Sequence, residues 1–498
     1  MSTSPPIKEL EDRYLLVGPI IDRHTTMATP ILDGHEYYRR IGAHITNCNG
    51  PGDVIYIVGW TFENSMHLPD VVDSLSEILH EKAASGVDVR VLLWASRWLT
   101  GTDMAESVPE ILFNFGAETA AGVYVEVVQR NIRLAEELRQ LGAPDFPLKG
   151  RVLLDWSGTR SHHAKYTILK AGNSIRAFIG IDYQTGYMDT PRHVGLQWHD
   201  VGFELQGGAV MSVWADFITR WKECTSLPLA RFRRAGVSKF YNTPTHFPDT
   251  PIPTPEQVPT TSYSIQILRS QGPTKYFKHF MAPSQSVRWE HYPQGGVQEV
   301  LACFVKAIAA ARRYIYVEDQ ALNDTFNKHV LLFPHIAQAL NRNVKVIFVT
   351  STQPDVIFDL PFGSPLSSDI KNMLETVEPS KRQNFVLYRV DRLTVHSKVV
   401  LIDDEFFTIG SANFFDASMS GADSELTVAV VDTGPLAVDW RVSLWKDHLR
   451  IPPDAPNLPE IEAEIRNLYK SLAIWRPGWG TGVSFPHPGP VLKLVGPE

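Results

Sequence analysis

Residues 395–404 read VHSKVVLIDD, and residues 406–425 read FFTIGSANFFDASMSGADSE. A related stretch, SHHAKYTILK, occupies residues 161–170. Each copy contains a His-x-Lys triplet followed by apolar, β-branched residues, a composition that predicts a strand. A single triplet carries little weight because chance alone can produce it. Two copies at the same place in similar halves of the chain indicate a duplicated folding unit.

Each triplet places an imidazole beside an ammonium. Alternate side chains of a strand face the same way, so His163 shares a face with Lys165. The same holds for His396 and Lys398. A lysine ammonium is a compact charge that suits phosphate oxygens, and an imidazole can act as a nucleophile or an acid. A solvated strand face is the alternative for either copy alone, but two copies in register favour a phosphate site.

A predicted glycine turn with polar residues follows the second triplet. Gly410 permits an unusual backbone there, and Ser411 and Asn413, two residues apart, can both point at one oxyanion. Glu425 follows on the next predicted strand. The second half therefore supplies several groups that could bind or orient around a phosphate.

The first half offers a similar arrangement. Residues 180–182 read GID and stand in place of the second half's turn, which makes Asp182 its polar residue. Asp200 stands where Glu425 stands in the second half. We expect these last two carboxylates to orient the histidine rings, a surface salt bridge being the alternative.

Short β-branched runs alternate with helical stretches in both halves, which predicts an α/β fold. The expected strands of the first half cover residues 53–60, 87–94 and 122–128, with a helix over 71–84. Those of the second half cover 313–320, 343–350 and 384–390, with a helix over 331–340. We therefore expect two similar α/β lobes, each a mixed sheet flanked by helices.

A proline-rich stretch near the middle of the chain, residues 243–260, excludes a helix or a central strand there. It is expected to connect the two halves, although a long surface loop within one domain would have the same composition. The predicted organisation is an N-terminal lobe, a linker, a C-terminal lobe and a tail, over residues 1–240, 241–262, 263–455 and 456–498.

The composition is that of an ordinary globular protein with a mildly acidic balance. The 47 Lys and Arg residues face 55 Asp and Glu residues, a net charge of −8 that disfavours nucleic acid as a partner. Three cysteines rule out a disulfide scaffold: Cys48, Cys224 and Cys303. The charged N-terminus predicts no signal peptide, and the densest apolar run, residues 54–62, is too short to span a bilayer. We expect a cytoplasmic or peripheral membrane protein.

The second copy of the motif resembles the signature of the phospholipase D superfamily, H-x-K-x4-D followed by a glycine turn with Asn. It matches in full, through His396, Lys398, Asp403, Gly410 and Asn413. Four further segments are similar in sequence to eukaryotic-type members: YMDTPRH and WHDV in the first half, and YIYVEDQ and SLWKDHL in the second. The resemblance implies two lobes with the active site between them.

The first copy departs from that signature in two places. Lys170 occupies the position of the first motif's Asp, and Ile179 replaces the first glycine of the turn. The resemblance implies that the equivalent Asp403 braces a loop behind the site without touching phosphate. The departures therefore bear on the geometry around His163.

The resemblance further implies a phosphohistidine mechanism. His163 is the expected nucleophile and His396 the expected acid and base, although the two roles could be exchanged. Lys165, Lys398 and Asn413 are expected to bind the phosphate. Ser411 and Asp182 are further candidate substrate contacts. Neither a metal ion nor another cofactor is expected, because the lysines supply the positive charge.

The leading hypothesis is hydrolysis of a phospholipid headgroup ester, with exchange of the headgroup as a further reaction. A nuclease of the same superfamily, a phosphodiesterase or transferase of a small metabolite, and an inactive binding homologue are the alternatives. Peripheral membrane contact and a monomer are expected. Trp94, Trp98, Leu99 and residues 360–363 could meet lipid or equally pack within the protein.

Overall fold

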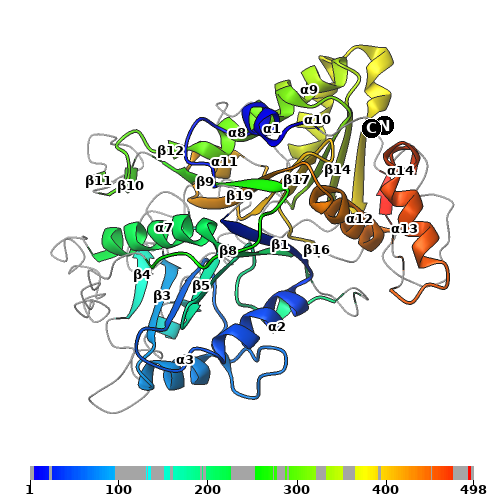
Figure 1. Ribbon diagram of the computed structural model, residues 1–498. Helices are drawn as coiled ribbons and strands as arrows, with labels where there is room; N and C mark the ends of the chain where they lie inside the picture. Colours follow the sequence, from blue (N-terminus) through cyan, green and yellow to red (C-terminus); the bar gives the residue numbers. More distant parts are fainter. Residues whose placement is uncertain are drawn as a thin grey trace.

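Two large β-sheets with helices packed against them make up the protein, shown by a computed structural model (Figure 1). The structure describes residues 5–21, 25–95, 130–131, 133–135, 151–156, 161–190, 193, 198–225, 253–272, 274–276, 287–288, 291–320, 332–351, 365–390, 394–414, 416–449, 451, 453–474 and 492–494. Within these ranges, no helix combines the length and the apolar character needed to cross a bilayer.

Seven described strands form the first sheet, in the order β1-β8-β6-β5-β2-β3-β4. Their bounds are β1 Thr26–Leu32, β2 Val54–Gly59, β3 Asp88–Ala95, β4 Val152–Trp156, β5 Tyr166–Ala171, β6 Ser174–Ile179 and β8 Val201–Gly207. Its helices are α2 Gly34–Ile45, α3 Leu75–Ala84 and α7 Gly208–Thr225. β2, β3 and β4 run parallel and the other pairings are antiparallel, so the sheet is mixed.

Nine described strands form the second sheet, in the order β12-β9-β19-β18-β17-β13-β14-β15-β20. Their bounds are β9 Tyr263–Gln271, β12 Val297–Gln298, β13 Tyr314–Glu318, β14 Lys345–Ser351, β15 Phe385–Val390, β17 Val399–Ile402, β18 Phe406–Gly410, β19 Glu425–Asp432 and β20 Leu492–Leu494. Its helices include α1 Ile7–Tyr14, α8 Glu299–Ala310, α9 Leu332–Asn341, α10 Pro365–Glu375, α11 Asp416–Ser420 and α12 Leu436–His448, with α13 Leu458–Arg466 and α14 Leu468–Ile474 beyond them. The order β9-β19-β18-β17-β13-β14-β15 repeats that of the first sheet, with the same parallel and antiparallel pairings.

The strand register around each histidine is also duplicated. In the first sheet Ile179 pairs with Tyr166 and with Phe203, which follow His163 and Asp200 by three residues each. In the second sheet Ile409 pairs with Val399 and Val428, which follow His396 and Glu425 by three residues each. Histidine, turn and carboxylate therefore occupy equivalent places in the two sheets.

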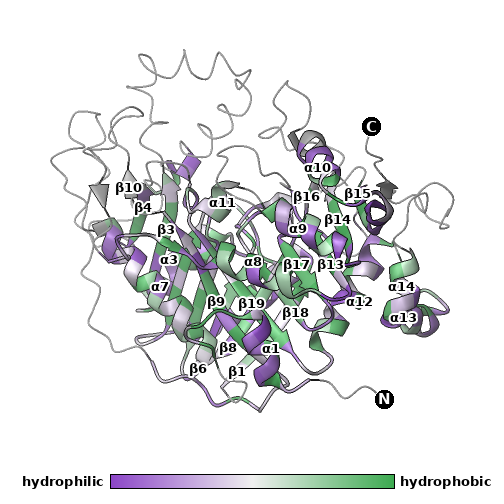
Figure 2. Cartoon of the chain, turned by 90° about the horizontal axis from the view of Figure 1, so that it is seen from above, coloured by the Kyte–Doolittle hydropathy of each residue, from purple (hydrophilic) through white to green (hydrophobic). Residues whose placement is uncertain are grey.

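The two sheets pack against each other through one shared hydrophobic cluster. Phe203 of β8 and Phe407 of β18 meet there with ring centroids 6.0 Å apart. Figure 2 shows hydrophobic residues gathered along strands such as β14 and β17. A two-stranded parallel sheet, β7 (Trp198–His199) with β16 (Thr394–Val395), further joins the halves. The core is therefore common to both halves.

The expected α/β class and two multi-stranded mixed sheets are confirmed. The predicted strands and helices that fall within the described residues are present, with one shift: the helix expected from residue 71 begins at Leu75, because Ser74 and Glu77 form a capping box there. Other elements were not predicted, among them β1, β4, β9, α2 and α8. The strand expected at 122–128 and the first part of the linker, 241–252, lie outside the described residues, and residues 253–262 hold no helix and only loop structure.

Candidate active site

His163 lies just before β5 and faces a carboxylate of the second sheet. Its Nδ1 is 3.1 Å from both carboxylate oxygens of Glu425, the first residue of β19. Its backbone N–H donates to the Ser424 carbonyl at 3.0 Å, which holds the two segments together. A proton on Nδ1 that is donated to Glu425 leaves the lone pair of the ring on Nε2, the atom available for chemistry.

His396 has the reciprocal arrangement. Its Nδ1 is 2.6 Å from Oδ2 of Asp200, which lies between β7 and β8 of the first half. Its backbone N–H donates to the His199 carbonyl at 2.8 Å. Each of these two histidines is thus oriented by a carboxylate from the opposite half of the chain, so both halves contribute to each pair.

Both lysines of the triplets are buried beside their histidines. Lys165 Nζ donates to the His163 carbonyl at 2.7 Å and lies 3.6 Å from Oδ2 of Asp182. Lys398 Nζ donates to the His396 carbonyl. A buried ammonium lacks solvation, which makes an anionic ligand at this place favourable.

The charges of the two halves act on the same groups. Burial, and then the ammonium groups of Lys165 and Lys398, hold the pKa of His163 well below its usual range. The same causes, burial followed by both ammonium groups, lower the pKa of His396, to which a charged His163 also contributes. The two rings therefore share one electrostatic environment and are neutral near pH 7 without a ligand.

Burial also shifts the groups around the rings. It raises the pKa of Asp200 to about 6 and that of Glu425 to about 7, against the opposing effect of the lysines. It lowers the pKa of Lys398 to about 8. Asn413 Oδ1 is buried and makes no hydrogen bond within the described part of the chain. The site is buried, and its two ammonium groups suit a bound anion.

Two candidate substrate contacts have partners inside the protein. The Ser411 hydroxyl donates to Glu425 and accepts the Leu426 N–H at 3.1 Å. Oδ1 of Asp182 accepts the Trp60 N–H at 2.9 Å. The structure therefore places Ser411 against Glu425, and Asp182 beside the ammonium of Lys165.

The glycine turn of the first half is also different from the sequence interpretation. By strand register Ile179 matches Ile409, and Gly180 matches Gly410. A Cβ atom on Gly180 would lie 2.7 Å from the Val201 carbonyl oxygen, and the residue has a φ of +120°. The glycine required by this close approach is thus present, and Ile179 is an ordinary buried strand residue.

Asp403 and Lys170 occupy equivalent places at the far ends of β17 and β5. Asp403 accepts the backbone N–H groups of Arg312, Arg313 and Tyr314 at 2.7 to 2.9 Å. Lys170 Nζ instead donates to the Gly52 carbonyl at 2.5 Å. At the equivalent place in the two sheets, a carboxylate accepts backbone N–H groups in one half and an ammonium donates to a backbone carbonyl in the other. Each side chain thus connects its strand to the segment before the neighbouring strand.

Aromatic residues that the sequence analysis did not select lie around the rings. The Trp60 ring centroid is 6.4 Å from that of His163, and the centroids of Tyr187 and Trp198 are 4.9 and 5.2 Å from that of His396. Trp198 could have been selected from the sequence, since it directly precedes His199 and Asp200. Trp94 is buried and stacks on Trp60, whereas Trp98, Leu99 and residues 360–363 lie outside the described residues.

Comparisons with known proteins find relatives of the phospholipase D type. A family model described as cardiolipin synthase, PLD-like domain, matches residues 304–445. Phospholipase D alpha 1 of Carica papaya is 21% identical over 86% of this chain and 65% of that protein. Phospholipase D A of Dictyostelium discoideum is 22% identical over 83% of this chain and 35% of that protein.

These matches indicate the class of the protein: in sequence the chain is similar to the phospholipase D superfamily, through the family model over residues 304–445 and through relatives matched over most of its length. It spans 65% and 35% of the lengths of the two relatives. A solved phosphatidylserine synthase from Haemophilus influenzae shares the fold, with a TM-score of 0.53 and 14% identity over 94% of this chain and 96% of that one.

Proposed function

We propose that the protein is a phosphodiesterase of the phospholipase D type that cleaves a phospholipid headgroup ester through a phosphohistidine. One observation carries the proposal: two imidazoles, each oriented by a carboxylate of the other half, share one buried environment with two ammonium groups. Two such rings provide a nucleophile and an acid for one diester, and the ammonium groups offset its negative charge.

In the first step Nε2 of His163 attacks phosphorus while the ester oxygen of the headgroup leaves. The bond to nitrogen forms, the phosphorus–oxygen bond breaks, and the leaving oxygen takes a proton from Nε2 of His396. His396 must therefore be protonated in the complex. Burial, and then repulsion by Lys398 and Lys165, lowers the pKa of His396 in the free protein. A phosphate anion against the two lysines offsets the repulsion, so substrate binding itself favours the required state.

In the second step His396, now neutral, takes a proton from the incoming water or alcohol. That oxygen attacks phosphorus and His163 leaves, which restores both rings. Water gives hydrolysis and an alcohol gives headgroup transfer. Both outcomes need the same residues, and the relatives include phospholipases D and, by fold, a phosphatidylserine synthase.

A lipid substrate is supported by the family and by the surroundings of the rings. Trp60 and Trp198, both half-buried, offer apolar surface beside the histidines. The net charge of −8 disfavours a nucleic-acid backbone as the substrate. Choline release from phosphatidylcholine vesicles, compared with nicking of supercoiled DNA, tests this assignment; DNA cleavage without choline release would overturn it.

The roles of the histidines are tested with a p-nitrophenyl phosphodiester, whose leaving group needs no acid. His396→Asn should release one equivalent of nitrophenolate in a burst and retain labelled phosphate after denaturation in alkaline detergent, in which a phosphohistidine is stable, because no base then activates water. His163→Asn should give neither the burst nor the label. The reverse pattern would exchange the roles, and absence of label in the wild type and both variants would refute the covalent mechanism. His67→Ala, at an exposed loop, is the control for normal turnover.

A further inference from the structure

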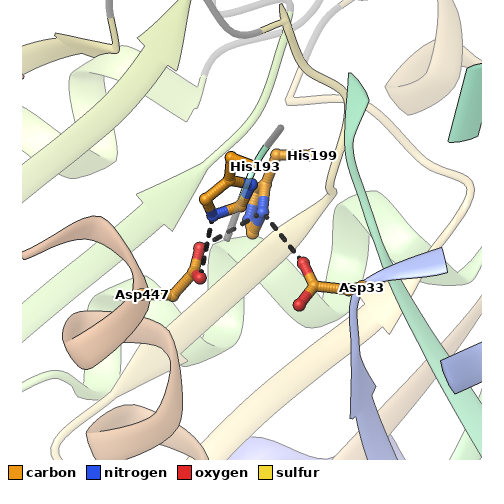
Figure 3. A group of neighbouring side chains, drawn as sticks. All are labelled: Asp33, His193, His199 and Asp447. Atoms are coloured by element: carbon orange, nitrogen blue, oxygen red, sulfur yellow. Dashed lines mark hydrogen bonds and ion pairs between the residues drawn. The ribbon is translucent and has the colours of Figure 1, made fainter. Parts of the chain in front are cut away.

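A second group of histidines and carboxylates is buried beside the proposed active site (Figure 3). Asp33 lies between β1 and α2, His193 and His199 precede β8, and Asp447 lies near the end of α12. All four are buried, and one oxygen or nitrogen atom of each lies within 4.8 Å of those of the others. The group joins the first half of the chain to a helix of the second.

We propose that Asp33, His193, His199 and Asp447 form a binding site for one zinc ion or a similar divalent transition-metal ion. Two imidazole nitrogens and two carboxylate oxygens make a set of four donors that zinc accepts in tetrahedral sites. The two carboxylates balance the double positive charge of the ion, which a fully buried site requires.

The separations around His199 fit an ion better than direct hydrogen bonds. Nδ1 of His199 is 3.4 Å from Asp447 Oδ2 and 3.8 Å from Asp33 Oδ1, and it makes no hydrogen bond to any described residue. Two ligands of a tetrahedral zinc ion, each bonded at about 2.0 Å, lie about 3.3 Å apart. Nδ1 of His199 therefore lies near Asp33 and Asp447 at separations close to those between two ligands of one zinc ion.

The outer nitrogen of each ring supplies an independent indication. His193 Nδ1 contacts Asp189, while its Nε2 lies 2.9 Å from Asp447 Oδ1. His199 Nε2 is 2.7 Å from Glu318 Oε1. Metal-ligating histidines characteristically donate the nitrogen that does not bind the metal to a carboxylate, which fixes the tautomer and the ring direction. Both rings have this arrangement.

A neighbouring group, His199 with Glu318 and His448, is a weaker candidate. The Glu318 carboxylate already accepts hydrogen bonds from both histidines, from Ser397 and from Tyr316. Its oxygens therefore have no need of an ion. It acts instead as the outer carboxylate that holds His199.

An ion at this place would stabilise the active site without taking part in the reaction. The His199 carbonyl accepts the N–H of His396, and the next residue, Asp200, orients that ring. The Asp33 N–H donates to the Asp200 carbonyl at 3.2 Å. Fixing Asp33 and His199 to α12 therefore fixes the segment that positions His396.

The test is metal analysis of the purified full chain, followed by cobalt substitution. We expect one zinc ion per chain and, after replacement by Co²⁺, the intense visible absorption of four-coordinate cobalt. His193→Asn should abolish that absorption. Asp189→Asn, which removes only the outer carboxylate of His193, should weaken zinc affinity about 10- to 100-fold. His448→Gln is the matched control, since it changes a buried histidine of the neighbouring group and should retain the cobalt spectrum.

Two results would overturn the proposal. The first is that folded wild-type protein contains no metal and develops no cobalt spectrum when Co²⁺ is added. The four residues would then form an ion-pair network with a protonated His199. Although burial lowers the pKa of His199, Glu318 and Asp447 raise it to about 10 in the metal-free protein, so this competing state is well defined. The second is loss of the spectrum in His448→Gln with retention in His193→Asn, which would move the ion to the neighbouring group. The wild-type measurement decides the question even where a variant does not fold.

Discussion

Replacing Glu425 by glutamine should slow the formation of phosphohistidine at His163 while the site keeps its shape. In the wild type the carboxylate accepts from three donors: Nδ1 of His163 and the hydroxyl groups of Ser411 and Ser418. A glutamine offers one oxygen and one NH2 group at the same positions. Its NH2 group faces donors, and the simplest relief is to move the His163 proton from Nδ1 to Nε2, which removes the nucleophilic lone pair.

The size of the effect follows from the interaction that is lost. A hydrogen bond to a charged group contributes about 1.5–3 kcal/mol. At about 1.36 kcal/mol for each tenfold change in rate, kcat should fall roughly 10- to 150-fold. KM should change little, because Glu425 orients the nucleophile and does not contact the phosphate. Ser418→Ala, which removes one neutral donor and leaves the carboxylate, should cost about 1 kcal/mol or less, or roughly fivefold in kcat.

Rapid-quench labelling over a range of pH measures this prediction. The pKa of Glu425 is raised to about 7, chiefly by burial, so protonation in the wild type should reduce the rate as the pH falls through 7. Glutamine cannot titrate, and the variant should lose that acid limb. Wild-type rates in Glu425→Gln, in protein with unchanged circular dichroism, would refute the assigned contact between the two halves.

Three further outcomes are expected. Burial lowers the pKa of Lys398 to about 8, so kcat/KM should fall as the pH rises through 8 and the ammonium is lost; a flat profile to pH 10 would contradict a role in phosphate binding. Asp403→Ala leaves three backbone N–H groups without their acceptor, so the free energy of unfolding measured by urea titration should fall by about 2–4 kcal/mol. Lys170→Ala removes only an exposed hydrogen bond and should lower the same free energy by about 0.5 kcal/mol or less. Gly410→Ala would bring a Cβ atom to 2.5 Å from the Thr427 Cα and should cost about 3 kcal/mol or more, whereas Gly50→Ala, with no atom within 4 Å, should be nearly neutral by thermal melting.

Local patterns in the sequence determined most of the secondary structure and the residue types of the site. β2, β3, β13, β14 and β15 lie where apolar, β-branched runs predict them, because strand formation follows side chains that are near one another in sequence. The triplets likewise placed each lysine with its histidine, since residues two apart share a strand face. α3 begins four residues after the start that apolar periodicity predicts. The capping box of Ser74 and Glu77 determines where the helix begins.

Only the tertiary structure decided which carboxylate serves which histidine. His163 and Glu425 are 262 positions apart, and His396 and Asp200 are 196 positions apart, and no local pattern encodes a pairing between two sheets. The hydrogen bond from Ser411 to Glu425 could not be predicted from the sequence either. Alternation along a strand indicates which face a side chain occupies but not its hydrogen-bond partner. Strand register and packing of the two sheets across one core supply that information, and they arise from contacts between distant parts of the chain.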